Sequence, residues 1–234
     1  MMSGPPTSWI DDLPSGRVIA EFSVWSADLL RLHDELVRIE PFADVLHVDA
    51  ADGHFAPALL FFPDLVAAIR RATSLPIHVH LMVDDDVLLS QIDQFSEAGS
   101  DLISIHLENA VVADAALDRL QAKGVAAGMV AMVDTPIADV SRFLSRLRFL
   151  TLLGTAIGVK GQGLDSAACD RLREAKRLIA ESRVEQRIVL AADGGIREHT
   201  VSDLRAAGAE SLVIGSLAFR APELASRMEW LSAI

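Results

Sequence analysis

The chain has 234 residues and a mass of 25.2 kDa; 51% of its residues are apolar and its mean hydropathy is +0.32. This composition supports a sizeable core and excludes global disorder. Lys and Arg total 21 against 33 Asp and Glu, which gives a formal charge of −12. Such a balance argues against nucleic acid or an anionic membrane surface as the main partner, whereas an anionic small molecule stays possible.

Neither a membrane span nor a secretory leader is expected. The longest stretch without Asp, Glu, Lys or Arg covers only residues 72–83, whereas a transmembrane helix needs about 20 apolar residues. The first sixteen residues contain no Lys or Arg but do contain Asp11 and Asp12, unlike a signal peptide. Cys169 is the only cysteine, so no intramolecular disulfide forms. We therefore expect a cytoplasmic protein.

Short apolar runs alternate with helical patterns along the whole chain. The runs are rich in Val, Ile, Leu or Phe, as buried parallel strands are, and they predict strands at 17–23, 44–49, 76–81, 102–106, 126–130, 147–153, 187–191 and 211–214. Apolar residues at helical spacing predict helices at 28–39, 63–71, 87–98, 110–122, 137–144, 166–181, 199–207 and 222–231. Gly99, Gly124 and Gly208 stand where three of these helices should end.

Eight strand–helix units in a chain of this length favour a closed barrel over an open doubly wound sheet. We therefore predict an α/β fold, a single-domain (β/α)8 TIM barrel that spans residues 17–234. Residues 1–16, which include Pro5, Pro6 and Pro14, are expected to form a leader or a cap on the bottom of the barrel.

Polar residues lie at the ends of three predicted strands, where TIM barrels place their active sites. His47 and Asp49 are two residues apart and so point to one side of their strand, His80 lies near the end of the next strand, and Asp193 ends the seventh. A lone strand-end His is more often a hydrogen-bonded core residue, and an Asp before Gly-Gly is more often part of a turn. Together, however, the side chains suit a divalent metal ion.

Glycines gather after the last three strands, at 158, 161 and 163, at 194 and 195, and at 215 before Ser216. Each cluster taken alone is explained by a tight turn. Three clusters at successive strand ends favour a phosphate-binding cup, because glycine lets backbone N–H groups approach an anion closely. Lys160 adds a positive charge there.

The chain resembles the ribulose-phosphate 3-epimerase family from about residue 19 to residue 219. Five stretches carry the resemblance: Ser-Val-Trp-Ser-Ala-Asp at 23–28, His-Val-Asp-Ala-Ala-Asp-Gly-His-Phe-Ala-Pro at 47–57, Val-His-Leu-Met-Val at 79–83, Asp-Gly-Gly at 193–195 and Gly-Ser at 215–216. The combination is specific, although each piece is short. It implies a phosphosugar-binding barrel with one divalent metal ion, namely Zn²⁺, Fe²⁺, Mn²⁺ or Co²⁺.

The resemblance also implies roles for individual residues. The metal ligands would be His47, Asp49, His80 and Asp193, with Asp49 as the proton acceptor and Asp193 as the proton donor at C3 of a ketose phosphate. Inversion would pass through a 2,3-enediolate whose charge the metal stabilises. The residues expected to contact the substrate are Ser23, His80, Met82, Gly158, Lys160, Gly161, Gly194, Gly195, Gly215 and Ser216. A homo-oligomer is expected as well.

Several positions depart from the family pattern. Ala51 and Leu153 stand where the family commonly has Met, His78 replaces an Asp two residues before the strand-end His, and Trp25 replaces an aliphatic residue. The loop at 156–162 carries the unusual Lys160. These changes affect the pocket and its loops, whereas the ligand pattern is intact. The roles of Lys160, Trp25 and His78 stay open.

The leading hypothesis is therefore epimerisation of D-ribulose 5-phosphate to D-xylulose 5-phosphate. A 3-epimerase of another ketose phosphate, a hexulose 6-phosphate or a tetrulose phosphate, is the alternative. A barrel lyase or decarboxylase is less favoured, because no Lys ends an early strand. A non-catalytic phosphosugar-binding barrel is the third possibility.

Overall fold

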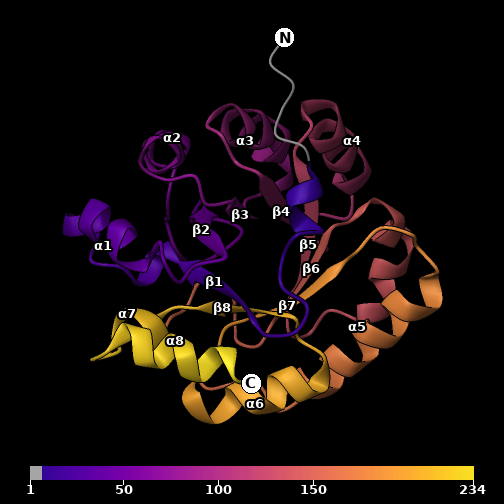
Figure 1. The fold of residues 1–234 in the computed structure, drawn as a ribbon. Coiled ribbons are helices and arrows are strands. Elements are labelled where there is room, and N and C mark those ends of the chain that lie inside the picture. The colour runs from indigo at the N-terminus through magenta and orange to yellow at the C-terminus, as the bar shows by residue number, and fades with distance from the viewer. Residues whose placement is uncertain (1–6) are drawn as a thin grey trace.

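The computed structural model describes residues 7–234, which fold into a closed barrel of eight parallel strands in sequence order. The strands are β1 (Ile19–Ser23), β2 (Val45–Ala51), β3 (Ile77–Met82), β4 (Leu102–His106), β5 (Ala126–Ala131), β6 (Phe149–Leu153), β7 (Val189–Asp193) and β8 (Ser211–Ile214). Figure 1 shows the strands at the centre and the helices in a ring around them. The predicted (β/α)8 TIM barrel is confirmed.

The helices connect successive strands around the outside of this barrel. The α-helices are α1 (Leu32–Ile39), α2 (Pro63–Ala72), α3 (Asp85–Glu97), α4 (Ala113–Lys123), α5 (Ala168–Ser182), α6 (Glu198–Ala207), α7 (Ser216–Phe219) and α8 (Leu224–Ser232). Four 3-10 segments complete the set: η1 (Thr7–Ile10), η2 (Val24–Ser26), η3 (Leu29–Arg31) and η4 (Ile137–Arg146). Among residues 7–234, no helix has the length and apolar character needed to cross a membrane.

Two predicted helices differ in kind from what the periodicity indicates. The predicted helix at 28–39 is divided, because the Asp28 carboxylate accepts a hydrogen bond from Leu30 N at 3.1 Å and starts the 3-10 turn η3 before α1. The segment predicted as a helix at 137–144 is the 3-10 helix η4. A periodicity that buries every third or fourth residue does not distinguish these two helix types over such short spans.

The seventh strand also lies further along the chain than predicted. Arg187 precedes it, and its Nη1 donates to the carbonyl oxygens of Ile10 (3.3 Å) and Leu13 (2.7 Å) near the bottom of the barrel. The strand ends at Asp193, two residues beyond the predicted bound of 191. This shift places the Asp193 carboxylate at the mouth, on the same face of the strand as Ala191.

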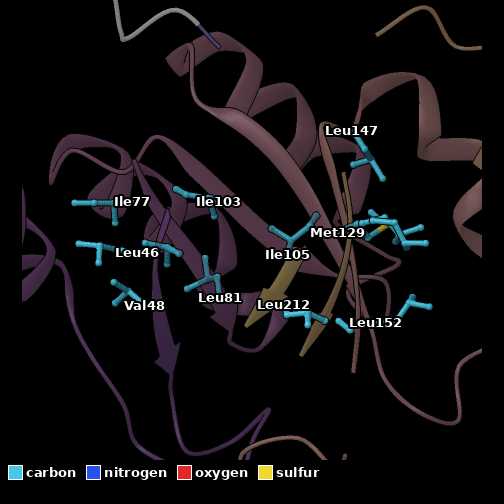
Figure 2. Close-up of a cluster of buried hydrophobic side chains, with 14 of the residues drawn as sticks. Leu46, Val48, Ile77, Leu81, Ile103, Ile105, Met129, Leu147, Leu152 and Leu212 are labelled. Carbon is cyan, nitrogen blue, oxygen red and sulfur yellow. The ribbon is translucent and has the colours of Figure 1, made fainter. Parts of the chain in front are cut away.

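The alternation of side chains along each strand separates an outer core from the barrel interior. Leu46 and Val48 on β2 belong to the core between the strands and the helices, as the sequence predicts, together with Leu81 on β3 and Met129 on β5. Figure 2 shows these side chains among the strands and helices. The odd-numbered residues of β2 therefore point into the barrel, which fixes the direction of His47 and Asp49.

An apolar plug fills the bottom of the interior and contacts the chain before β1. Ile10 and Leu13 belong to the same buried cluster as Phe149, and Trp9 packs against it with its ring 6.4 Å from that of Phe149. In Figure 1 the short indigo segment η1 lies beside β4 and β5, which contribute Leu102 and Ala126 to this cluster. Residues 1–6 of the predicted leader lie outside the described residues, and the division at residue 16 stays a prediction.

Replacing Ile10 with Ala tests whether this cap stabilises the barrel. Ile10 is 0% exposed, so the change leaves a cavity and should lower the free energy of unfolding by about 2–5 kcal/mol in urea denaturation. Leu30→Ala is the matched control, because Leu30 is 97% exposed and its loss should cost less than about 0.5 kcal/mol. Equal effects of the two substitutions would show that the cap adds nothing.

Candidate metal and active site

The four predicted ligand residues come together at the mouth of the barrel. His47 and Asp49 point inward from β2, His80 from β3 and Asp193 from the end of β7, and the Cα atoms of Asp49 and His80 are partners in the β2–β3 ladder. One donor atom from each of the four lies within 4.8 Å of all the others. This cluster can hold a metal ion.

The distances within the cluster suit a small coordination sphere. Asp49 Oδ1 lies 3.3 Å from His47 Nε2 and 3.3 Å from His80 Nδ1. Asp193 Oδ2 lies 3.8 Å from the same His47 nitrogen and 3.7 Å from that of His80. Ligands about 2.0–2.2 Å from a tetrahedral ion are separated by roughly 3.3–3.6 Å, so the spacing fits such an ion.

Two ring nitrogens in this cluster have no hydrogen-bond partner. His47 Nε2 and His80 Nδ1 are both buried, and both face the carboxylates. A buried polar atom without a partner is unfavourable, so each such atom calls for an explanation. Burial would lower the pKa of His47, but Asp49, Glu21 and Asp193 raise it well above its ordinary value, so an ion that binds Nε2 takes the place of a proton. Imidazole nitrogens beside two carboxylates form a donor set that Zn²⁺, Mn²⁺, Fe²⁺ and Co²⁺ accept, and the residues present therefore fit a divalent ion.

The tautomer of His80 follows from a chain of hydrogen bonds on its far side. Glu108 Oε2 accepts from His106 Nδ1 at 2.9 Å, and His106 Nε2 lies 2.8 Å from His80 Nε2. Burial lowers the pKa of His106 to about 4, so its ring is neutral and its Nε2 accepts the proton of His80 Nε2. Burial alone would raise the pKa of Glu108, but hydrogen bonds from His106 and Thr135 lower it to about 2. The lone pair of His80 therefore resides on Nδ1, inside the cluster.

His47 has a carboxylate on its far side as well. Glu21 on β1 is fully buried, and its Oε2 lies 3.1 Å from His47 Nδ1 and 2.8 Å from His78 Nδ1. His78 Nε2 is in turn 2.7 Å from Ser104 Oγ. Burial lowers the pKa of His78, so that ring is neutral.

The surroundings of the two aspartates shift their pKa values in opposite directions. Burial would raise the pKa of Asp49, but the adjacent His47 and His80 lower it by more, and its pKa lies well below the usual range. Burial raises the pKa of Asp193, His47 opposes this, and repulsion from Asp49 raises it further, so the net pKa lies above its ordinary value. Paired groups whose pKa values diverge are typical of acid–base sites.

A cavity of about 500 Å³ opens above the cluster. Asp49, His80 and Asp193 line it, as do all the residues predicted to contact substrate: Ser23, Met82, Gly158, Lys160, Gly161, Gly194, Gly195, Gly215 and Ser216. His47 lies beneath the cavity floor and is fully buried. Ser23 Oγ donates to Asp49 Oδ2 at 3.1 Å, which connects β1 to the cluster.

The glycines beside this cavity have two independent explanations. A Cβ at Gly194 would collide with Thr155 and one at Gly215 with Ser26, so close packing of neighbouring loops alone requires glycine there. Within residues 7–234, however, the backbone N–H groups of Gly194, Gly195, Gly215 and Ser216 also donate to no other group. These amides are therefore free to bind an anion in the cavity.

Positive side chains line the same cavity. Lys160 Nζ donates to the carbonyl oxygen of Trp25 at 2.6 Å and lies 4.4 Å from the centre of its ring. This contact connects the loop after β6 to the loop after β1, past the ends of β7 and β8. Arg197 and Arg220 line the cavity too. The mouth of an otherwise acidic protein thus carries three cations.

Sequence reasoning missed Glu21 and the His106–Glu108 pair. His106 reads as a surface or supporting residue, yet it is 0% exposed and contacts His80. A signal existed for Glu21: it is a charged residue in the middle of an apolar strand, two residues before Ser23, and so shares its inward face. Nothing in the sequence alone shows that His78, Glu21 and His47 meet.

Solved structures with the same fold include two enzymes of different chemistry. The 3-hexulose-6-phosphate synthase of Salmonella typhimurium covers 92% of this chain and 97% of its own, with a TM-score of 0.68 and 14% identity. The tryptophan synthase α-subunit of Pyrococcus furiosus covers 93% and 95%, with a TM-score of 0.64 and 19% identity. At such identities the likeness shows the fold alone.

Sequence comparison gives a closer relationship. The ribulose-phosphate 3-epimerase of Bacillus subtilis is 31% identical over 84% of this chain and 90% of its own length. The ribulose-phosphate 3-epimerase 1 of Cupriavidus necator is 34% identical over 86% and 84%, and that of Escherichia coli K12 is 32% identical over 86% and 88%. The model of the ribulose-phosphate 3 epimerase family matches residues 19–219. The chain therefore belongs to the ribulose-phosphate 3-epimerase family.

Proposed function

We propose that the protein is a metal-dependent 3-epimerase that interconverts D-ribulose 5-phosphate and D-xylulose 5-phosphate. One observation carries the proposal: two carboxylates and two unpartnered imidazole nitrogens converge on the floor of a cavity in a chain of this family. Inverting C3 of a ketose requires one group to remove a proton and another to return it to the opposite face. Asp49 and Asp193 are the two candidates.

The metal would be held by His47 Nε2, His80 Nδ1 and one oxygen each of Asp49 and Asp193. A bound divalent ion supplies Lewis-acid stabilisation of the negative charge that forms on O2 and O3 of the 2,3-enediolate. Zn²⁺, Fe²⁺, Mn²⁺ and Co²⁺ all accept this ligand set, and the ligands do not select among them.

The two aspartates divide the proton transfers between them. The lowered pKa of Asp49 keeps it ionised, which suits the proton acceptor, whereas the raised pKa of Asp193 suits the donor. The Ser23 hydroxyl, which donates to Asp49, orients that carboxylate and contacts the sugar. Met82 lies against Ala51 at the rim and supplies apolar contact beside the reacting carbons.

The phosphate of the substrate would occupy the opposite end of the cavity. The free amides of Gly194, Gly195, Gly215 and Ser216 suit a dianion there, and Gly158 and Gly161 extend the same wall. Lys160, which follows β6 and lines the same cavity, adds a positive charge. Binding energy from the phosphate would position C3 between the two aspartates.

The substrate is the part of the proposal that depends on the altered loops. A hexulose 6-phosphate or a tetrulose phosphate is the alternative, since Ala51, Leu153 and Trp25 reshape the walls relative to the family pattern. A non-catalytic phosphosugar-binding role is the remaining one. The homo-oligomer and the cytoplasmic location stay predictions.

Proton exchange at C3 tests the reaction directly. We would load the protein with Zn²⁺, Mn²⁺, Fe²⁺ or Co²⁺, add D-ribulose 5-phosphate in D2O, and follow deuteration and xylulose 5-phosphate by NMR. The expected result is metal-dependent exchange with formation of the epimer. Asp49→Asn and Asp193→Asn should each lower the rate at least about a hundredfold, because a positioned acid or base contributes roughly 10²–10⁴.

Asp170→Asn, on the exposed face of α5, is the matched control and should leave the exchange rate unchanged. The metal content of each variant is measured alongside, because both active-site aspartates are also predicted ligands. Absence of exchange with every metal would overturn the ribulose assignment. The other ketose phosphates would then be assayed, and their failure as well would favour the non-catalytic role.

Lys160→Met tests the phosphate end. Loss of the ammonium group should raise KM for D-ribulose 5-phosphate about tenfold with little change in kcat, because the contact is made equally in the ground state and the transition state. Inorganic phosphate should also inhibit the variant more weakly than the wild type. The control is Lys176→Met, since Lys176 is exposed on α5 away from this cavity. An unchanged KM for the Lys160 variant would remove Lys160 from the substrate site.

A further inference from the structure

We propose that Glu21 is a positioning residue that fixes the tautomer and ring orientation of His47 and thereby sets the affinity of the cluster for a metal ion. The inference rests on the proposed function, because it takes the cluster to be a metal site. It assigns a task to a carboxylate that neither substrate binding nor proton transfer uses.

Glu21 occupies an unusual place for a charged side chain. It is 0% exposed, and its Cα partners in the neighbouring strands are Val45 on β2 and Val213 on β8. Moving a carboxylate out of water is costly unless hydrogen bonds compensate it. A valine or alanine at this position would fill the interior without that cost, so the carboxylate has a reason other than packing.

The partners of Glu21 are two histidines and a serine, with no Lys or Arg among them. Its Oε1 accepts from Ser211 Oγ at 2.5 Å, and its Oε2 faces both His47 Nδ1 (3.1 Å) and His78 Nδ1 (2.8 Å). One carboxylate oxygen thus faces both ring nitrogens while the other accepts from Ser211, so Glu21 is the shared acceptor and both Nδ1 atoms donate to it.

The consequence for His47 is specific. With Nδ1 held by Glu21, the nitrogen that the ring presents to an ion is Nε2, which is the unpartnered nitrogen 3.3 Å from Asp49 Oδ1. The His78 ring meets the His47 ring edge-on, with centroids 4.9 Å apart at 76°, and so limits its rotation. Glu21 thus sets which nitrogen faces the cluster, and His78 helps to set the direction in which it points.

His78 has its own support, which extends the network across the interior. Its Nδ1 donates to Glu21, and its Nε2 accepts from Ser104 Oγ at 2.7 Å. Glu21, His47 and His78 also lie close enough together to suggest a second metal centre. Their separations of 2.8 and 3.1 Å, however, run from two ring nitrogens to the same carboxylate oxygen, which is the geometry of hydrogen bonds.

A carboxylate behind a histidine ligand has a measurable effect. It orients the ring and raises the basicity of the coordinating nitrogen, and loss of such a partner lowers metal affinity roughly 10–100-fold. Glu21→Gln keeps the shape of the side chain but replaces one oxygen with an N–H₂ group. The amide no longer offers a charged oxygen that accepts hydrogen bonds from both rings. The hydrogen bond that orients His47 therefore weakens.

The test compares the affinity of the full chain for Zn²⁺ by competition with a chromophoric chelator. Glu21→Gln is expected to weaken binding by about 10–100-fold. Thr151→Val is the matched control: Thr151 is as fully buried as Glu21, lies on β6, and its hydroxyl oxygen has no hydrogen-bond partner in the network around His47. This variant should bind Zn²⁺ like the wild type, and circular dichroism should show both variants to be folded.

A nitrogen-15 NMR spectrum of the zinc-loaded wild type gives a second readout that needs no variant. His47 should show a protonated Nδ1 whose proton is deshielded and slow to exchange, and Glu21→Gln should remove both properties. A folded Glu21→Gln protein with wild-type affinity, or a Thr151→Val protein weakened as much, would overturn the inference. If Glu21→Gln does not fold, the wild-type spectrum decides, and absence of the hydrogen-bonded Nδ1 proton would overturn it.

The outcome is separable from that of the epimerase proposal. A wild-type protein that binds Zn²⁺ tightly and shows the Glu21 effect, but exchanges no C3 proton on any ketose phosphate, would overturn the proposed reaction and leave the role of Glu21 standing. A wild-type protein with no affinity for Zn²⁺ at this site would overturn both.

Discussion

A polar side chain inside a closed barrel has no water to bind, so it must find a partner on another strand. Strands β1 to β4 meet this requirement repeatedly. Glu21 accepts hydrogen bonds from His47 and His78. Ser104 donates to His78, and His106 accepts from His80. In this network two ring nitrogens at the mouth, His47 Nε2 and His80 Nδ1, have no hydrogen-bond partner. The candidate metal site lies where the network leaves its acceptors open.

The two unpartnered nitrogens belong to rings that are oriented by different carboxylates. Glu21 acts on His47 from deeper in the barrel, and Glu108 acts on His80 through the ring of His106. Each route ends on a carboxylate, and each leaves one ring nitrogen, His47 Nε2 or His80 Nδ1, facing Asp49. Such preparation stabilises the binding geometry before any ion arrives, but it also keeps unsatisfied buried groups in the metal-free protein. An ion that binds only the folded state would therefore raise stability by mass action.

The sequence predicts the strands well because buried parallel strands have few competing readings: β4 and β8 match their predicted bounds, and the others differ by one or two residues at either end. It also predicts the four residues of the cluster, since alternation along β2 fixes the common direction of His47 and Asp49. It does not predict the contact between Glu21 and His47, which depends on the register of β1 against β2. The 3-10 form of η4 escapes prediction for a local reason, because both helix types bury similar positions over ten residues.

Strands and loops contribute different parts of the site. The four cluster residues project from strands whose direction the barrel fixes, so the geometry for proton transfer tolerates little change. The charge at the far end of the cavity comes largely from loops and from the chain after β8, through Lys160, Arg197 and Arg220. In a protein of net charge −12, these cations place a local positive potential at the cavity. Such a potential raises the local concentration of an anionic substrate at the end where free amides bind it. It leaves the chemistry at the metal end unchanged, so substrate choice can shift while the reaction stays the same.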